Sequence, residues 1–256
     1  MSGSGARPSA TADPFIQVTD LTIGWGDVVL QQNATFRVER GEVFAVLGGS
    51  GCGKSTLLRY LVGLETPHTG EILIDGIGRP SLEAGRPPFG VMFQSGALFG
   101  SLTVGENVGL ALEQWTRLPY DAIAAIVLAK LKLVGLDGAA NKLPSELSGG
   151  MKKRAAIARA MALEPELIFL DEPSAGLDPV SAAELDELII TLNQVLGLTV
   201  VLVTHELPSI FKIAKRCIML DKETKSIIAT GDPSELRDGS ADPRVHDFFN
   251  RIPRSG

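Results

Sequence analysis

Short runs of consecutive apolar residues alternate along this chain with segments whose apolar residues recur every three or four positions. The runs at 43–47, 167–170 and 199–203 lack a polar face, which is typical of strands buried inside a parallel sheet. The segment 179–196 lies between two of these runs and predicts the crossover helix of a strand–helix–strand unit. The core is therefore expected to be α/β.

The N-terminal part has a different pattern. Residues 15–39 contain two stretches rich in Val, Ile, Thr and Phe, broken by turn residues at 24–27, and predict an antiparallel strand pair. Short strands are expected at 71–75 and 90–93, joined by a loop at 77–89 that is rich in Gly, Pro and Arg. A small antiparallel unit is thus expected to precede the rest of the core.

Helical periodicity dominates the middle of the chain. Leu57, Leu58, Leu61 and Leu64 predict a helix over 54–64. From about 100 to 163 the pattern predicts a helical subdomain, in which an amphipathic helix over 123–134 ends at Gly135.

The chain is expected to close with a hairpin at 218–221 and 226–230 and an amphipathic helix at about 242–252. Val245, Phe248, Phe249 and Ile252 form the apolar stripe of this helix. The stripe can bind a twin, bind an accessory protein or fold onto its own body, and we favour the last. Residues 1–13 are small and polar without the apolar segment of a secretory signal, so we expect a disordered tail before a single domain over 14–256.

Composition narrows the possible functions. A chain of 256 residues that is 45% hydrophobic can bury one substantial core. Its net charge of −6 disfavours nucleic acid as a partner. The two cysteines lack disulfide-framework spacing and favour a reducing compartment, and no apolar run approaches the roughly 20 residues that a membrane-spanning helix needs.

A glycine-rich loop between a predicted strand and a predicted helix matches the pattern G-x-x-x-x-G-K-[ST]. The loop and its continuation comprise Gly48, Gly49, Ser50, Gly51, Cys52, Gly53, Lys54, Ser55 and Thr56. Its backbone N–H groups are expected to wrap a phosphate, Lys54 to neutralise the β and γ oxygens, and Ser55 to offer its hydroxyl to Mg²⁺. We expect bound ATP to shield Cys52 from thiol reagents. A plain glycine-rich turn would not require this strand and helix context.

Polar residues follow three predicted strands at the edge where ligands bind in open α/β sheets. Asp171 follows the run 167–170 and is the expected Mg²⁺ ligand, while Glu172 is the candidate general base, with a helix-capping acid as the alternative. Gln94 can contact Mg²⁺ and the attacking water, although most glutamines are surface residues. His205 can hold a γ-phosphate oxygen, although a single histidine there is more often structural.

A second anion-binding device lies far from the first along the chain. Ser148, Gly149 and Gly150 precede a helix rich in Lys and Arg, so the helix N-terminus can bind a phosphate. One chain then has two phosphate-binding devices but a single set of Mg²⁺ and base residues. This imbalance suggests a head-to-tail dimer with shared ATP.

In order and spacing, the motifs GGSGCGKST, Gln94, LSGGM, LIFLDE, SAGLD and His205 resemble those of ABC ATPase cassettes across nearly the whole chain. The resemblance implies a P-loop NTPase with a RecA-like core, an N-terminal antiparallel β-subdomain and a helical subdomain. It also implies two cassettes that enclose two ATP molecules with Mg²⁺, Asp178 in the loop between the sites, and Trp25 stacked on adenine. The alternative for Trp25 is a tryptophan buried in a turn.

A narrower resemblance rests on Met151 in place of the usual Gln, on FQSGALF and on DPRV near the end. These stretches are similar to the ATPase subunit of Mla-type phospholipid transporters, although the loop 77–89 diverges. The resemblance implies a location on the cytoplasmic face of the bacterial inner membrane, with a permease, an Mce-domain protein and a small accessory protein as partners. Since the chain stops soon after Ile252, the longer C-terminal dimerisation arm of some relatives is expected to be absent.

Within this resemblance, a permease helix is expected to dock near 94–106. Phe99, Leu102 and Val104 can line that groove or pack internally. Three other functions remain open: an ABC importer for a small solute, a soluble ABC ATPase of DNA repair or translation, and a GTPase or kinase. The soluble ATPases usually carry two cassettes or long insertions, and a GTPase or kinase would leave LSGGM unexplained.

Overall fold

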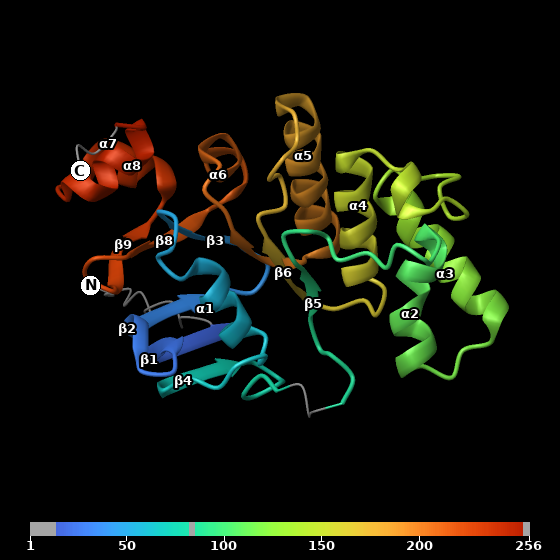
Figure 1. Ribbon diagram of the computed structural model, residues 1–256, viewed down its shortest axis with the longest axis horizontal. Helices are drawn as coiled ribbons and strands as arrows, with labels where there is room; N and C mark the ends of the chain where they lie inside the picture. The colour runs from blue at the N-terminus through green and yellow to red at the C-terminus, as the bar shows by residue number, and fades with distance from the viewer. Residues whose placement is uncertain (1–13, 82–84, 253–256) are drawn as a thin grey trace, which may run out of the picture.

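Two sheets and a group of helices make up the computed structural model, which describes residues 14–81 and 85–252 (Figure 1). The predicted tail at 1–13 lies outside the described residues. The larger sheet has the order β5-β6-β7-β3-β8-β9. Its strands are β3 (Val43–Gly48), β5 (Gly90–Met92), β6 (Leu167–Asp171), β7 (Thr199–Val203), β8 (Arg216–Asp221) and β9 (Ser226–Gly231). All neighbours are parallel except β8 and β9, which form the predicted antiparallel hairpin.

The central strands are buried on both faces, which explains their continuous apolar runs. In β3, Phe44 packs into a core under one face of the sheet and Ala45 into a core under the other. In β6, the neighbouring residues Ile168 and Phe169 likewise pack into cores on opposite faces of the sheet. Helix α5 (Pro179–Leu196) connects β6 to the adjacent parallel strand β7, as the sequence predicts.

The smaller sheet is antiparallel, in the order β2-β1-β4, and consists of β1 (Ile16–Trp25), β2 (Val28–Val38) and β4 (Thr69–Ile74). Helix α1 (Lys54–Leu61) lies between the two sheets (Figure 1) and shares its apolar core with both. The helix ends three residues before the predicted Leu64. Gly63 adopts a left-handed φ of 73°, and its N–H and that of Leu64 bond to the carbonyls of Tyr60 and Arg59, which closes the helix.

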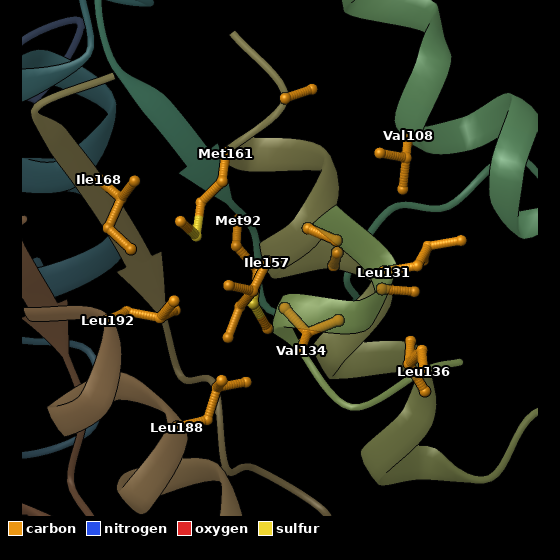
Figure 2. Close-up of a cluster of buried hydrophobic side chains, with 14 of the residues drawn as sticks. Met92, Val108, Leu131, Val134, Leu136, Ile157, Met161, Ile168, Leu188 and Leu192 are labelled. Carbon is orange, nitrogen blue, oxygen red and sulfur yellow. The ribbon is translucent and has the colours of Figure 1, made fainter. Parts of the chain in front are cut away.

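Helices α2 (Val104–Trp115), α3 (Tyr120–Leu133) and α4 (Gly149–Ala160) form a lobe beside β5 and β6 (Figure 1). This lobe shares one apolar core with the sheet and α5, because Val108, Leu131, Ile157, Ile168 and Leu192 belong to a single buried cluster, in which Ile157 lies between the others (Figure 2). The lobe is therefore packed onto the larger sheet and does not form a core of its own.

The start of the lobe decides between the two alternatives for Phe99, Leu102 and Val104. Val104 is fully buried and packs internally, so it does not line an external groove, whereas Phe99 is 57% exposed and Leu102 is half-buried. Asn107 is also fully buried, and its amide bonds to the backbone of Phe99, Leu102 and Thr103. These bonds hold the loop that presents Phe99 to solvent.

Three shorter helices, α6 (Leu207–Ile213), α7 (Pro233–Gly239) and α8 (Pro243–Asn250), complete the chain. In α8, Val245 and Phe249 are buried and Phe248 packs beside them, whereas Ile252 lies beyond the helix and is 46% exposed. The stripe therefore packs mainly on its own body. No helix in the described residues is long and apolar enough to cross a bilayer.

Replacing Phe249 by alanine should lower the free energy of unfolding by about 3 kcal/mol, because the ring is almost fully buried against α6 and Phe248. Chemical denaturation of the purified protein measures this change. The matched control is Ile252→Ala, which should change stability by less than about 0.5 kcal/mol because that side chain is half exposed. Equal effects of the two substitutions would contradict the packing of α8.

Candidate active site

Four neighbouring parallel strands end at one edge of the larger sheet, and each is followed by predicted site residues. The glycine-rich loop at 48–56, called the phosphate loop below, follows β3. His205 follows β7, Glu172 follows β6 and Gln94 follows β5. These groups surround one cavity of about 570 Å³. Its lining comprises Gly48, Gly49, Ser50, Gly51, Gly53, Lys54, Ser55, Thr56, Gln94, Glu172, His205 and Phe248. The topology therefore collects residues that are more than 150 positions apart, from Gly48 to His205.

The phosphate loop leads directly into the N-terminus of α1, with Gly53 as its N-cap. Gly48 has a φ of 144°, and a Cβ there would lie 2.5 Å from the carbonyl oxygen of Leu220. The Lys54 Nζ folds back to donate to the carbonyls of Gly48, at 2.8 Å, and Gly49, at 3.1 Å. The ammonium group is thus held over the loop, beside the positive end of the α1 dipole.

Ser55 and Asp171 meet below the loop, although they are 116 residues apart. The Ser55 Oγ donates to the Asp171 Oδ1 at 3.0 Å. Burial raises the pKa of the Asp171 carboxyl, and the Ser55 hydrogen bond partly opposes this rise. A hydroxyl and a carboxylate are hard oxygen donors of the kind that Mg²⁺ takes. In the described part of the chain no group of three or more His, Cys, Asp or Glu residues is placed to hold a metal.

Glu172 is held in an unusual backbone conformation. Its φ is 47°, which costs a residue other than glycine about 1–2 kcal/mol. The backbone N–H donates to Val203 at 2.8 Å, and the carboxylate Oε1 lies 2.7 Å from the Nδ1 of His205. The other oxygen, Oε2, is buried and has no hydrogen-bond partner among the described residues. The N-cap of α5 is Asp178, so the alternative of Glu172 as a helix-capping acid is wrong.

His205 is more exposed than Glu172, with 55% of its side chain accessible against 8%. Its Nε2 lies 3.7 Å from the Oε1 of Glu206, on the side away from the Glu172 contact. The imidazole therefore links the carboxylate of Glu172 to the open side of the cavity.

The residues Ser148, Gly149 and Gly150 do not line this cavity. Ser148 is the N-cap of α4, and its Oγ accepts from the N–H of Met151 at 3.3 Å. A Cβ on Gly149 would lie 3.2 Å from a side-chain atom of Leu177, and a Cβ on Gly150 would lie 3.6 Å from a side-chain atom of Ser181. The two segments predicted to bind anions are therefore separate within one chain, since α4 and α1 belong to different layers of the fold (Figure 1).

Asp178 lies at the start of α5, beside these glycines. Its carboxylate accepts from the N–H groups of Val180 and Ser181 and from the Ser181 hydroxyl. The Ser181 hydroxyl and N–H bonds lower the pKa of the Asp178 carboxyl. These bonds make Asp178 the N-cap of α5.

Three other predicted site residues, Asp171, Trp25 and Cys52, also lie outside the cavity lining. Trp25 is 46% exposed and is not a tryptophan buried in a turn, and the Arg59 guanidinium lies 5.6 Å from its ring centroid. Cys52 is only 1% exposed, and burial raises the pKa of its thiol. The protein itself covers this thiol when no ATP is bound. The expectation that bound ATP is what shields Cys52 from thiol reagents is therefore wrong.

Two residues of the site were missed from the sequence. Gln31 in β2 is buried, and its amide donates to the carbonyls of Cys52, at 2.8 Å, and Asp221, at 2.9 Å. Lys153 in α4 is also buried, and burial lowers the pKa of its ammonium group while Asp171 and Glu172 oppose this. The signal for Lys153 was its position just before the apolar run 155–158 of the same helix. Counting Lys153 only as one of several basic residues hides this signal.

Comparisons with known proteins give the family of this chain. The profile of the ABC transporter family matches residues 31–175. The intermembrane phospholipid transport system ATP-binding protein MlaF of Escherichia coli strain K12 is 42% identical over 93% of this chain and 89% of its own length. The probable ribonucleotide transport ATP-binding protein mkl of Mycobacterium leprae is 40% identical over 97% of this chain and 71% of its own length.

Two solved structures share the fold. One, described as the dimeric structure of a post-hydrolysis state of the ATP-binding cassette MJ0796 bound to ADP and Pi, superposes with a TM-score of 0.75 at 31% identity, over 85% of this chain and 98% of that one. The other, cbiO1 from Clostridium perfringens, gives 0.78 at 30% identity, over 94% and 97%. The fold class predicted from the sequence is confirmed. The chain belongs to the ABC transporter family and is a nucleotide-binding ATPase subunit of it.

Proposed function

We propose that this ATPase powers the transport of phospholipid between the inner and outer bacterial membranes, from the cytoplasmic face of the inner membrane. The proposal is supported by 42% identity to MlaF proteins of Escherichia coli and Haemophilus influenzae over more than nine-tenths of the chain. It is also supported by the Met151 variant of the LSGGM motif and by FQSGALF. The cargo would not contact this chain, which would supply the energy.

The observation that carries the hydrolytic part is the environment of Glu172. One carboxylate oxygen is bound to His205, and the other is buried without a partner among the described residues although Glu172 lines the cavity. An orphaned acceptor of this kind fits a water molecule that attacks the γ-phosphate. Glu172 would orient that water and take its proton, while His205 fixes the carboxylate and Gln94 borders the same space.

The phosphate loop, Lys54 and the Ser55–Asp171 pair would hold ATP and Mg²⁺. The cradle has open glycine positions, since a Cβ on Gly49 would contact nothing within 4 Å. Lys54 would exchange its two loop carbonyls for phosphate oxygens, and Ser55 and Asp171 supply oxygen donors for the metal. When bound, Mg²⁺ neutralises charge on the β- and γ-phosphates. Trp25, exposed at the end of β1, would stack on the adenine.

The separation of the two anion-binding devices supports a homodimer. Lys54 lines the phosphate cavity, whereas Ser148 and Gly150 line a different cavity of about 300 Å³. In a head-to-tail pair, the α4 N-terminus of one copy would cover the triphosphate held by the other, and Asp178 would lie between the two sites. Each copy would then complete the pocket of its neighbour.

The surface for the permease would be an apolar groove between the lobe and β5. This groove, of about 430 Å³, includes Phe89, Phe99, Leu110 and Trp115, of which Phe99 and Trp115 are 57% and 40% exposed. An amphipathic permease helix fits such a groove. An Mce-domain protein and a small accessory protein would complete the assembly.

The relatives leave a second cargo to test, because mkl is named for probable ribonucleotide transport. The native complex, reconstituted in vesicles, should transfer a fluorescent phospholipid to acceptor vesicles only while ATP is hydrolysed, and Glu172→Gln in this chain should abolish the transfer. The proposed cargo would be contradicted if Glu172→Gln left phospholipid transfer unchanged but abolished ribonucleotide uptake.

A further inference from the structure

Lys153 is a buried cation that touches two residues of the proposed hydrolytic site through their main chain. Its Nζ donates to the carbonyl of Gln94 at 2.5 Å and to the carbonyl of Glu172 at 3.2 Å. The side chain comes from α4, whereas Gln94 follows β5 and Glu172 follows β6. One ammonium group therefore joins the helical lobe to the ends of two strands.

The contact with Glu172 falls on the strained part of the backbone. A residue other than glycine at a φ of 47° keeps that conformation only when its surroundings hold it there. Both backbone polar groups of Glu172 are held: the carbonyl of Val203 accepts from the N–H, and the C=O accepts from Lys153 and from the N–H of Ala175, each at 3.2 Å. Without Lys153 the carbonyl would keep only the neutral bond from Ala175, so the left-handed conformation of Glu172 would be held less firmly. The carboxylate would then be held less firmly as well.

Gln94 depends on the same group. Its side chain is exposed at the cavity and its backbone is tied to α4 by the Lys153 bond. The neighbouring loop is tied to α4 as well, because Arg159 donates to the carbonyls of Gly96 and Ala97. The loop after β5 thus follows the position of α4.

We propose that Lys153 is a positioning residue that sets Gln94 and Glu172 for hydrolysis and links them to the start of α4, where the neighbouring copy's nucleotide is bound. Ser148 lies five residues before Lys153, about 7.5 Å along the same helix axis. A shift of α4 on capture of the neighbour's triphosphate would move Lys153, and with it the two carbonyls. Lys153 touches no nucleotide, so it acts through Gln94 and Glu172. This inference rests on the proposed hydrolytic role of Glu172.

The test compares Lys153→Met, Lys153→Arg and the control Lys132→Met in the full chain. Methionine keeps the apolar stem but removes the donors, so kcat should fall about 10- to 100-fold while the KM and the Kd for ATP stay within about threefold of wild type. Lys153→Arg restores donors and charge and should recover most of kcat. Lys132 is an exposed lysine of α3, and its substitution should leave kcat, KM and the Kd for ATP unchanged. Melting curves report whether each variant is folded.

A wild-type kcat in Lys153→Met would overturn the inference, as would a loss that appears mainly in the Kd for ATP or that arginine does not recover. If Lys153→Met does not fold, Lys153→Gln replaces it, since its amide is uncharged and one bond shorter. Glu172→Gln is measured in the same series. If it retains hydrolysis, the proposed function fails; if it is inactive while Lys153→Met is fully active, the role of Lys153 alone fails.

Discussion

Replacing Glu172 by glutamine should leave ATP binding intact and lower the rate of ATP hydrolysis by about 10²- to 10⁴-fold. The amide cannot take a proton from water, whereas Lys54, Ser55 and the phosphate loop are untouched by the change. Because the triphosphate then persists, the variant should accumulate as an ATP-bound dimer. Phosphate release measures hydrolysis, and size-exclusion chromatography with and without ATP measures dimerisation.

The matched control for this variant is Glu113→Gln, an exposed position on α2 outside the cavity. It should hydrolyse ATP at the wild-type rate. Turnover close to wild type in Glu172→Gln would remove Glu172 from its proposed role, since its orphaned oxygen would then serve no proton transfer.

Replacing Lys54 by methionine should weaken ATP binding about 100-fold and abolish hydrolysis. The ammonium group is expected to exchange its bonds to Gly48 and Gly49 for bonds to phosphate oxygens, and two charge-assisted hydrogen bonds stabilise a complex by about 3 kcal/mol. Isothermal titration calorimetry with ATP gives the affinity.

Lys132→Met, which removes an exposed lysine of α3, is the control for Lys54→Met and should bind ATP normally. An unchanged affinity in Lys54→Met would contradict the assignment of the phosphate loop. Melting curves without nucleotide separate loss of binding from loss of folding, because the Lys54 side chain is not part of an apolar core.

The sequence predicts the sheet edge well because each part of it leaves a local signal. Glycines, Lys54 and Ser55 must follow each other to wrap a phosphate, and buried strands must be continuously apolar. The residues Asp171 and His205 are then placed by the rule that ligands bind at the carboxyl ends of parallel strands. Helix α5 has the predicted bounds for the same reason, since a proline begins it and Gly197 ends it.

Long-range contacts leave no such signal. Gln31 reaches Asp221 across 190 residues, and Lys153 reaches Gln94 across 59. A polar residue in a strand or an amphipathic helix is compatible with solvent exposure until the packing of the layers is known. Val104 was ambiguous for the same reason, because the lobe and not the local pattern decides which side of that loop is covered.

The central claim is that the Ser148 turn of one copy completes the nucleotide pocket that Lys54 opens in another. The most direct measurement is a structure of the Glu172→Gln variant with Mg²⁺ and ATP, in its intact assembly. It should show each triphosphate in contact with Lys54 of one copy and with Ser148 and Gly150 of its partner. A triphosphate enclosed by one copy alone, with Ser148 far from any nucleotide, would contradict it.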